Sequence, residues 1–301
     1  MEAAERIRQD NVRYHDLAAD DYDFKWGISY GQVGREQVLG KLGKALGEEP
    51  GPFQRALEIG AGTGYFTLNL LRAGVVEEAV ATDISAGMLA VLEESAADLG
   101  LTVETARCEA AELPFPDSSF DLVIGHAVLH HLPDLEGAFV EFARVLRPGG
   151  TIAFCGEPSR YGDRLAGLPK RGAQALAPLW RALVRANAKS NGAAAAEPAE
   201  IDQLEQAVDV HAFTPSELVE AARGAGFEAV RVRGEELAAS LFGWVNRALE
   251  ATADPDEVPW AWRVYAHRGY LALQQLDRRV LEPHLPAAIF YNLLLSARMP
   301  D

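Results

Sequence analysis

The sequence predicts an α/β fold in which helices cover both faces of a mostly parallel sheet. Through the middle third of the 301-residue chain, apolar strand patterns alternate with helical patterns. Short loops join these elements, as they do in doubly wound sheets. One of the loops is a cluster of glycines between a strand and a helix, at the carboxyl end of a strand, where such sheets bind their ligands.

The elements of this sheet follow in order from residue 55 onward. The first strand runs into the glycine cluster, and a helix with apolar periodicity follows it directly. Ser85 is suited to cap the next helix and Gly100 to end it, while Arg147-Pro148-Gly149-Gly150 stops the third. We expect strands at 55–59, 78–82, 101–106, 120–125 and 151–155, and helices at 63–72, 86–99 and 135–146.

The pattern changes after Glu157. Residues 160–192 contain seven basic residues and one acidic residue, in a chain that is otherwise acidic. Within them, the spacing predicts a helix over 176–190 with an apolar and a basic face. This basic helix is either a solvated face or a contact surface for an anionic substrate, a carrier protein or membrane headgroups. Its apolar face comprises Leu176, Leu179, Trp180, Leu183 and Val184, and its basic face comprises Arg181, Arg185 and Lys189.

The core pattern returns after a short break. Four alanines between Gly192 and Pro198 predict a hinge or a frayed helix end. Thr214-Pro215-Ser216-Glu217 has the hydroxyl cap, the early proline and the glutamate of a helix start, and Gly226 ends that helix. We expect strands at 227–233 and 289–297, separated by a mostly helical stretch at 235–284 that carries three tryptophans.

Composition limits the possible functions. The chain has 28 Lys and Arg against 44 Asp and Glu, a net charge of −16, which argues against a nucleic-acid-binding protein. Cys108 and Cys155 are too few for a disulfide framework, and the seven histidines lack metal-ligand spacing, so no metal site is expected. With no secretory leader or spanning apolar run expected, the sequence predicts a cytoplasmic protein.

The glycine cluster is the strongest local signal in the chain. Gly60, Gly62 and Gly64 lie between a strand and a helix, so a ligand can approach the backbone closely and meet the free N–H groups of the helix N-terminus. Asp83 ends the second strand 19 residues after Gly64. A carboxylate in that position is placed to accept both hydrogens of a ribose diol.

The spacing of these glycines selects among nucleotide ligands. A dinucleotide fingerprint needs a third glycine at position 65, where the chain has Tyr65. Glu58 adds a negative charge beside the loop, which repels phosphate and suits a cation. The site is therefore expected to bind an adenosine-type cofactor that has no phosphates and carries a positive group. Strong binding of NAD is not expected, and no P-loop occurs.

Five motifs in order resemble the class I S-adenosylmethionine-dependent methyltransferases. They are Glu58-x-Gly60-x-Gly62-x-Gly64, residues 81–89, residues 109–121, residues 126–132 and residues 146–150. The resemblance implies a Rossmann-like, seven-stranded sheet with a last antiparallel strand and helical cap insertions. It implies an N-terminal helical lid at 1–46, core segments at 47–158, 213–234 and 289–301, and cap insertions at 159–212 and 235–288.

The resemblance also implies how the methionine part of S-adenosylmethionine is held. The three glycines would pack against it. Glu58 would hold its ammonium group directly or through water, and the main-chain carbonyl of His126 would contact the same group.

The adenosine contacts carry over in the same way. Asp83 would bind the ribose hydroxyls, and Ile84 and Met88 would flank the adenine ring. Glu109 stands where many relatives have aspartate and would accept the exocyclic N–H. The main-chain N–H of Ala110 would face a ring nitrogen.

The acceptor side is less defined. Residues 14–23 resemble a lead-in that forms a lid over the methyl group in small-molecule methyltransferases, so Tyr14 or Tyr22 could orient cofactor or acceptor. His130, His131 and His15 are candidate general bases, because imidazole titrates near neutrality, but each is also compatible with a packing role. The catalytic residue is left open.

The predicted function is transfer of a methyl group by in-line displacement to a small or lipid-like, partly apolar molecule. One alternative is different chemistry on the same cofactor, such as cyclisation or alkyl transfer. The other is a non-catalytic protein that binds the cofactor. The sequence selects neither the acceptor nor the oligomeric state.

Overall fold

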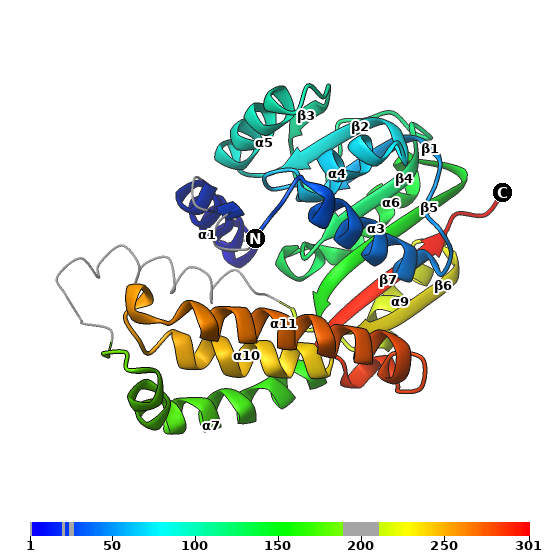
Figure 1. Ribbon diagram of the computed structural model, residues 1–301. Helices are drawn as coiled ribbons and strands as arrows, with labels where there is room; N and C mark the ends of the chain where they lie inside the picture. The colour runs from blue at the N-terminus through cyan, green and yellow to red at the C-terminus, as the bar shows by residue number, and fades with distance from the viewer. Residues whose placement is uncertain (1, 20–21, 24–26, 189–210) are drawn as a thin grey trace. The chain divides into compact units, whose positions relative to one another are not determined.

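The computed structural model describes residues 2–19, 22–23, 27–188 and 211–301 (Figure 1). The chain divides into two compact units. The first comprises Met1–Glu157, Pro198–Val232 and Leu294–Asp301, and the second comprises Pro158–Glu197 and Arg233–Leu293. The four alanines after Gly192 lie outside the described residues.

A seven-stranded sheet organises the first unit, with the strand order β3-β2-β1-β4-β5-β7-β6. The sheet is mostly parallel, with β7 antiparallel, which confirms the predicted Rossmann-like class. β1 pairs in parallel with both β2 and β4. Its carboxyl end, which the glycine cluster follows, therefore lies between the carboxyl ends of these two strands. The strands are β1 Phe53–Ile59, β2 Val76–Asp83, β3 Glu104–Arg107, β4 Phe120–His126, β5 Leu146–Pro158, β6 Glu228–Glu235 and β7 Asn292–Arg298.

Helices pack on both faces of this sheet. Apolar residues of α3 (Gln32–Leu46) and α4 (Tyr65–Ala73) share a buried cluster with Ala56, Ala79 and Ala153 of the strands. Leu92 of α5 (Ala86–Asp98) packs on Ala81, which lies on the same sheet face as Ala79 because strand side chains alternate. On the opposite face, α6 (Leu135–Val145) packs its phenylalanines against Phe154 and lies next to α9 (Pro215–Gly224).

The bounds of the strands differ from the sequence expectations at several points. The last strand, expected at 289–297, begins at Asn292, because residues 287–289 form a 3₁₀ turn. The third strand begins at Glu104 and not at residue 101. The segment Arg147–Gly150 is part of β5, although α6 does end immediately before it, at Val145. Its backbone is held by the end of the chain, since Gly149 N–H donates to Pro300 O at 3.1 Å and Met299 N–H donates to Gly150 O at 2.8 Å.

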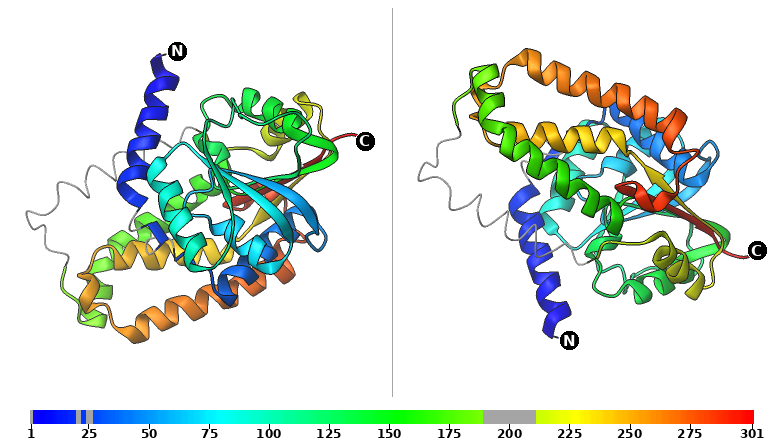
Figure 2. Two further views of the ribbon diagram at one scale, coloured as in Figure 1. Left: turned by 90° about the horizontal axis from the view of Figure 1, so that it is seen from above. Right: turned by 90° about the horizontal axis from the view of Figure 1, so that it is seen from below.

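The part of the second unit that the structure describes is built on α7 (Arg160–Val184), α10 (Ala238–Glu250) and α11 (Trp260–Leu276). α10 lies beside both α7 and α11 (Figures 1 and 2). Their buried cluster includes Trp180 and Leu249, and the Trp180 and Trp262 rings meet at 5.3 Å. None of the helices that the structure describes is both long enough and apolar enough to cross a membrane.

The basic helix predicted over 176–190 is wrong in its bounds. α7 starts at Arg160 and ends at Val184, because Arg185 takes a left-handed conformation with φ +61°. The predicted apolar face also divides in two. Trp180 is buried against the other helices, whereas Leu176, Leu179 and Leu183 are exposed.

Candidate functional site

The turn between β1 and α4 is a backbone cradle. Its three glycines all have positive φ, +59° at Gly60, +53° at Gly62 and +92° at Gly64. A Cβ at Gly60 would lie 2.4 Å from Val128 Cγ2, and one at Gly64 would lie 2.8 Å from Leu92 Cγ. A Cβ at Gly62 would meet nothing within 4 Å. Gly60 and Gly64 therefore allow close packing of the protein itself, and Gly62 is the glycine whose backbone borders open space.

Asp83 holds this cradle from the end of β2. Its Oδ2 accepts the Gly62 N–H at 2.9 Å, and its Oδ1 accepts the Ser85 N–H at 2.9 Å. The residue is nearly buried, and each carboxylate oxygen keeps a further lone pair that can accept another donor. The site thus combines an anionic acceptor with an uncovered stretch of backbone, which suits a ligand that has a diol and no phosphate.

Glu58 lies behind the cradle on β1. Its Oε2 accepts hydrogen bonds from both the N–H and the Oγ1–H of Thr67, in the first turn of α4. Burial raises the pKa of the Glu58 carboxyl to about 8, and the negative charge of Asp83 adds to the rise. The carboxyl is therefore mostly neutral at pH 7. A cation bound nearby would favour its ionised form.

The residues predicted on the adenine side lie around the start of α5. Met88 is buried, and its N–H donates to the capping Ser85 Oγ at 3.0 Å. Ile84 is half-buried and Ala110 is buried. The Glu109 carboxylate forms an ion pair with the Arg8 guanidinium at 2.8 Å, so the side chain predicted to contact adenine is held by α1 (Glu2–Ala18).

α1 is also fixed to the N-terminus of α5 (Figure 1). Asp16 Oδ1 accepts the Gly87 N–H at 3.1 Å and the Ser85 hydroxyl at 2.5 Å. An anionic side chain is favoured there by the helix dipole. This contact places α1 beside the residues that follow Asp83.

The candidate acceptor-side residues come together from two segments. His130 and His131 lie in a single 3₁₀ turn, Leu129–His131, after β4, with their ring centroids 3.9 Å apart. The His15 ring of α1 lies 5.8 Å from the His131 ring and 4.9 Å from the Tyr14 ring. Tyr22 is further out, with its ring centroid 6.4 Å from that of His15.

Sequence reasoning missed Glu157, which organises this turn. It is fully buried near the end of β5. Its Oε1 accepts the N–H groups of Val128 and Leu129 at 3.0 and 3.1 Å, and its Oε2 accepts the His130 N–H at 3.1 Å and the His130 Nδ1–H at 2.9 Å. Because the carboxylate is the acceptor, Nδ1 of neutral His130 carries the proton and Nε2 is the basic nitrogen. An acidic residue next to the carboxyl end of a strand was the available signal.

His126 ends β4 beside the cradle. Its ring stacks on Phe66 at 5.0 Å and approaches the Tyr65 ring at 5.9 Å. The side chain is thus packed among aromatic residues. A contact of its carbonyl with an ammonium group stays a prediction.

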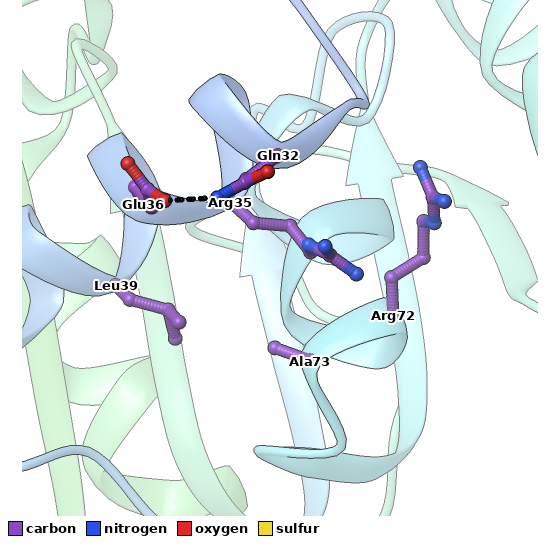
Figure 3. Close-up of a pocket in the computed structure, with 6 residues that line it drawn as sticks. All are labelled: Gln32, Arg35, Glu36, Leu39, Arg72 and Ala73. Atoms are coloured by element: carbon purple, nitrogen blue, oxygen red, sulfur yellow. Dashed lines mark hydrogen bonds between the residues drawn. The ribbon is translucent and has the colours of Figure 1, made fainter.

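The surface of the protein has one hollow beside α3 and α4 and another beside α1. One, of about 370 Å³, is lined by residues of α3 together with Arg72 and Ala73 of α4 (Figure 3). Ala73 is the last residue of α4, so this hollow is at the end of α4 opposite to the glycine cradle. The other, of about 560 Å³, is lined by one face of α1 together with Arg107 and Glu109, next to the adenine-side residues. Within the described part of the chain, no group of His, Cys, Asp and Glu side chains has the arrangement of a metal site.

The chain is similar in sequence to known methyltransferases. Residues 57–154 match the family described as Methyltransferase domain. The malonyl-[acyl-carrier protein] O-methyltransferase of Methylococcus capsulatus is 36% identical over 151 residues, covering 45% of this chain and 53% of that protein. The ubiquinone/menaquinone biosynthesis C-methyltransferase UbiE of Burkholderia cenocepacia is 35% identical over 102 residues, 34% of this chain and 42% of that protein.

A solved structure shows the same fold. Phosphoethanolamine N-methyltransferase 2 of Haemonchus contortus, in complex with phosphomonomethylethanolamine and S-adenosylhomocysteine, aligns with a TM-score of 0.58 at 18% identity, covering 98% of this chain and 59% of that chain. The chain spans about half the length of the curated relatives it matches.

Proposed function

Because the chain belongs to the class I S-adenosylmethionine-dependent methyltransferase family, we propose that it transfers a methyl group from S-adenosylmethionine to a small or lipid-like, partly apolar molecule. The observation that carries this proposal is the uncovered backbone at Gly62, held by the Asp83 carboxylate. A diol-bearing, cationic and phosphate-free nucleoside meets both features. The relatives' names include O- and C-methylation, so the acceptor atom is left open.

The residues of the first unit fit this cofactor. Asp83 can accept the ribose hydroxyls while it holds the Gly62 N–H. Burial favours the neutral form of Glu58. A nearby ammonium group would lower the pKa of this carboxyl, which would release its proton to solvent and then pair with the ammonium group as a carboxylate. Glu109 would accept the adenine N–H with α1 lying against the same side.

S-adenosylmethionine, when bound, supplies a methyl group on a positively charged sulfur. A nucleophile attacks the methyl carbon in line and displaces the sulfur. The protein contributes mainly by holding the acceptor close to that methyl group and by excluding water. In this chain, the His130 and His131 turn and α1 border the place where an acceptor would enter.

We assign His130 the role of proton acceptor and Glu157 that of its positioning residue. Glu157 accepts the Nδ1–H of His130 and so leaves Nε2 as the basic nitrogen of the ring. A base of this kind suits an acceptor that loses a proton from oxygen or carbon. A chain of ring contacts continues from His130 through His131 and His15 to Tyr14. These three further side chains would orient the acceptor.

The test is a screen of small hydroxylated, carboxylated and amine acceptors with methyl-labelled S-adenosylmethionine and analysis of both products. We expect labelled acceptor together with S-adenosylhomocysteine. Methylthioadenosine would support alkyl transfer or cyclisation. Tight cofactor binding without acceptor-dependent turnover would support a non-catalytic binding protein.

Once an acceptor is found, His130→Gln should lower kcat by roughly 10²-fold or more while cofactor affinity stays unchanged. His131→Gln, in the same turn, is the control, and its effect should be smaller, because it is the His130 ring that Glu157 holds at 2.9 Å. Equal effects of the two substitutions would contradict the assignment of His130.

A further inference from the structure

The outer face of α7 carries an apolar stripe that the helical core does not use. The stripe comprises Tyr161, Leu165, Leu176, Leu179 and Leu183, whose exposed fractions run from 44% at Leu165 to 79% at Leu183. At about 100° per residue, these five positions fall within an arc of about 60° on the helix. They form two groups on the same side of a helix of 25 residues, Tyr161 and Leu165 near its start and Leu176, Leu179 and Leu183 near its end.

This stripe is distinct from the face of α7 that packs in the unit. Ala173, Ala177 and Trp180 are buried in the cluster with Leu249 of α10. The helix therefore has one apolar face for its neighbours and a second one that its own unit leaves uncovered. Large apolar side chains gathered in the open on one side of a helix indicate an interaction site.

Charge is distributed unevenly between the two units. The second unit has 13 Lys and Arg against 10 Asp and Glu, whereas the first has 15 against 34. Arg164 and Arg171 are exposed, and on the helical wheel they lie about 100° from the centre of the stripe. Arg185 is exposed at the end of the same helix. The apolar stripe thus lies on the part of the chain that carries net positive charge.

We propose that the α7 stripe docks on the surface of a bilayer that contains anionic lipids. A helix that lies in the membrane interface buries an apolar face among the acyl chains and places arginines at the headgroups, which is the pattern of α7. A second copy of the chain fits less well, because two stripes in contact would bring their arginines together. The acidic first unit would be repelled by the same surface, so α7 accounts for the attachment.

Membrane docking extends the proposed function but does not depend on it. A methyltransferase attached at the interface could reach a lipid-like acceptor that dissolves poorly in water. The cofactor residues belong to the first unit and the stripe to the second, so each can be tested without the other.

The test is co-sedimentation of the full chain with vesicles of phosphatidylcholine containing phosphatidylglycerol, and with vesicles of phosphatidylcholine alone. We expect binding to the anionic vesicles that is at least about tenfold stronger than to the neutral ones and that weakens strongly between about 0.05 and 0.5 M NaCl. The variant Leu176→Glu/Leu179→Glu/Leu183→Glu should lose this binding by at least about tenfold. Val140→Glu, which changes a 57% exposed valine on α6, is the matched control and should bind as the wild type does.

Three results would overturn the proposal: no binding of the wild type to anionic vesicles, equal binding of the triple variant, or a dimer in sedimentation velocity that the triple variant dissociates. Calorimetric titration with S-adenosylmethionine should give the same affinity for all variants. If the wild type binds the anionic vesicles but does not bind S-adenosylmethionine, the result would count against the proposed function and not against membrane docking.

Discussion

Two neighbouring loops at the carboxyl edge of the sheet are held by the same device and present different chemistry. The glycine cradle after β1 is held by Asp83 from the end of β2, and the histidine turn after β4 is held by Glu157 from β5. In both, a carboxylate from the next strand accepts main-chain N–H groups. The first loop exposes backbone at Gly62, whereas the second presents imidazoles. The difference matches the roles proposed above, in which the first loop binds the cofactor and His130 of the second accepts a proton.

Removal of Glu157 should have the largest effect. Glu157→Leu would leave three main-chain N–H groups and the His130 Nδ1–H buried without their acceptor. We expect the free energy of unfolding to fall by about 3–5 kcal/mol, measured by urea denaturation. Glu112→Leu, at an exposed position, should change it by less than about 0.5 kcal/mol. A stability loss below about 1 kcal/mol for Glu157→Leu would mean that the carboxylate does not hold the turn.

Removal of Asp83 tests the other carboxylate. Asp83→Ala deletes the acceptor of the Gly62 N–H together with the group proposed to bind the ribose. Calorimetric titration should show S-adenosylmethionine binding weakened by roughly 100-fold or more, about 3 kcal/mol, while the chain stays folded. The control is Asp98→Ala at the end of α5, which removes one negative charge as Asp83→Ala does and should bind S-adenosylmethionine normally. Normal binding by Asp83→Ala would move the cofactor site elsewhere.

The pH dependence of stability tests the buried acid behind the cradle. The pKa of Glu58 is raised from 4.5 to about 8 in the folded state, so its contribution to stability is fully present below pH 4.5 and is lost as pH rises toward 8. Between pH 5.5 and 8, the unfolding free energy of the wild type should fall relative to Glu58→Gln by about 3 kcal/mol. Glutamine keeps an oxygen that can accept from Thr67. Parallel pH profiles of the two proteins would show that the carboxyl titrates normally.

The smallest effect separates two glycines of the cradle. Gly60→Ala and Gly62→Ala both place a Cβ on a residue with positive φ, which costs about 1–2 kcal/mol. At Gly60 the new methyl group would also lie 2.4 Å from Val128 Cγ2. The free energy of unfolding of Gly60→Ala should therefore be about 1 kcal/mol lower than that of Gly62→Ala. Thermal unfolding of both variants measures the difference. An equal loss would mean that Val128 moves aside freely.

The part of the site that depends on backbone shape could be predicted from the sequence. Glycines at 60, 62 and 64 and an acid at 83 mark positions where few other residues serve, and the fold that they imply is the one observed. Glu157 gave only the weak signal of an acid near the end of a strand, because its hydrogen-bond partners lie 27 to 29 residues away in the chain. The histidine turn was predicted as a set of candidates, and its arrangement needed the structure.

α7 shows the same limit for helices. Its spacing predicted one apolar face, yet packing against α10 takes Trp180 and leaves Leu179 and Leu183 outside. Periodicity gives the direction of a side chain around a helix axis, and only the neighbouring helices decide how much of that arc is covered. The left-handed residue at Arg185, which ends the helix, is not marked by a glycine.

The contact between Gly60 and Val128 has a mechanical consequence. Val128 fills the volume in front of Gly60, and its own amide is fastened by Glu157, which also grips the imidazole of His130. We therefore expect that an effect of a ligand bound at the first loop would reach the second loop through this one valine. If the two loops have the roles proposed above, binding of the cofactor would affect His130 before the acceptor binds, which favours ordered binding of the two ligands.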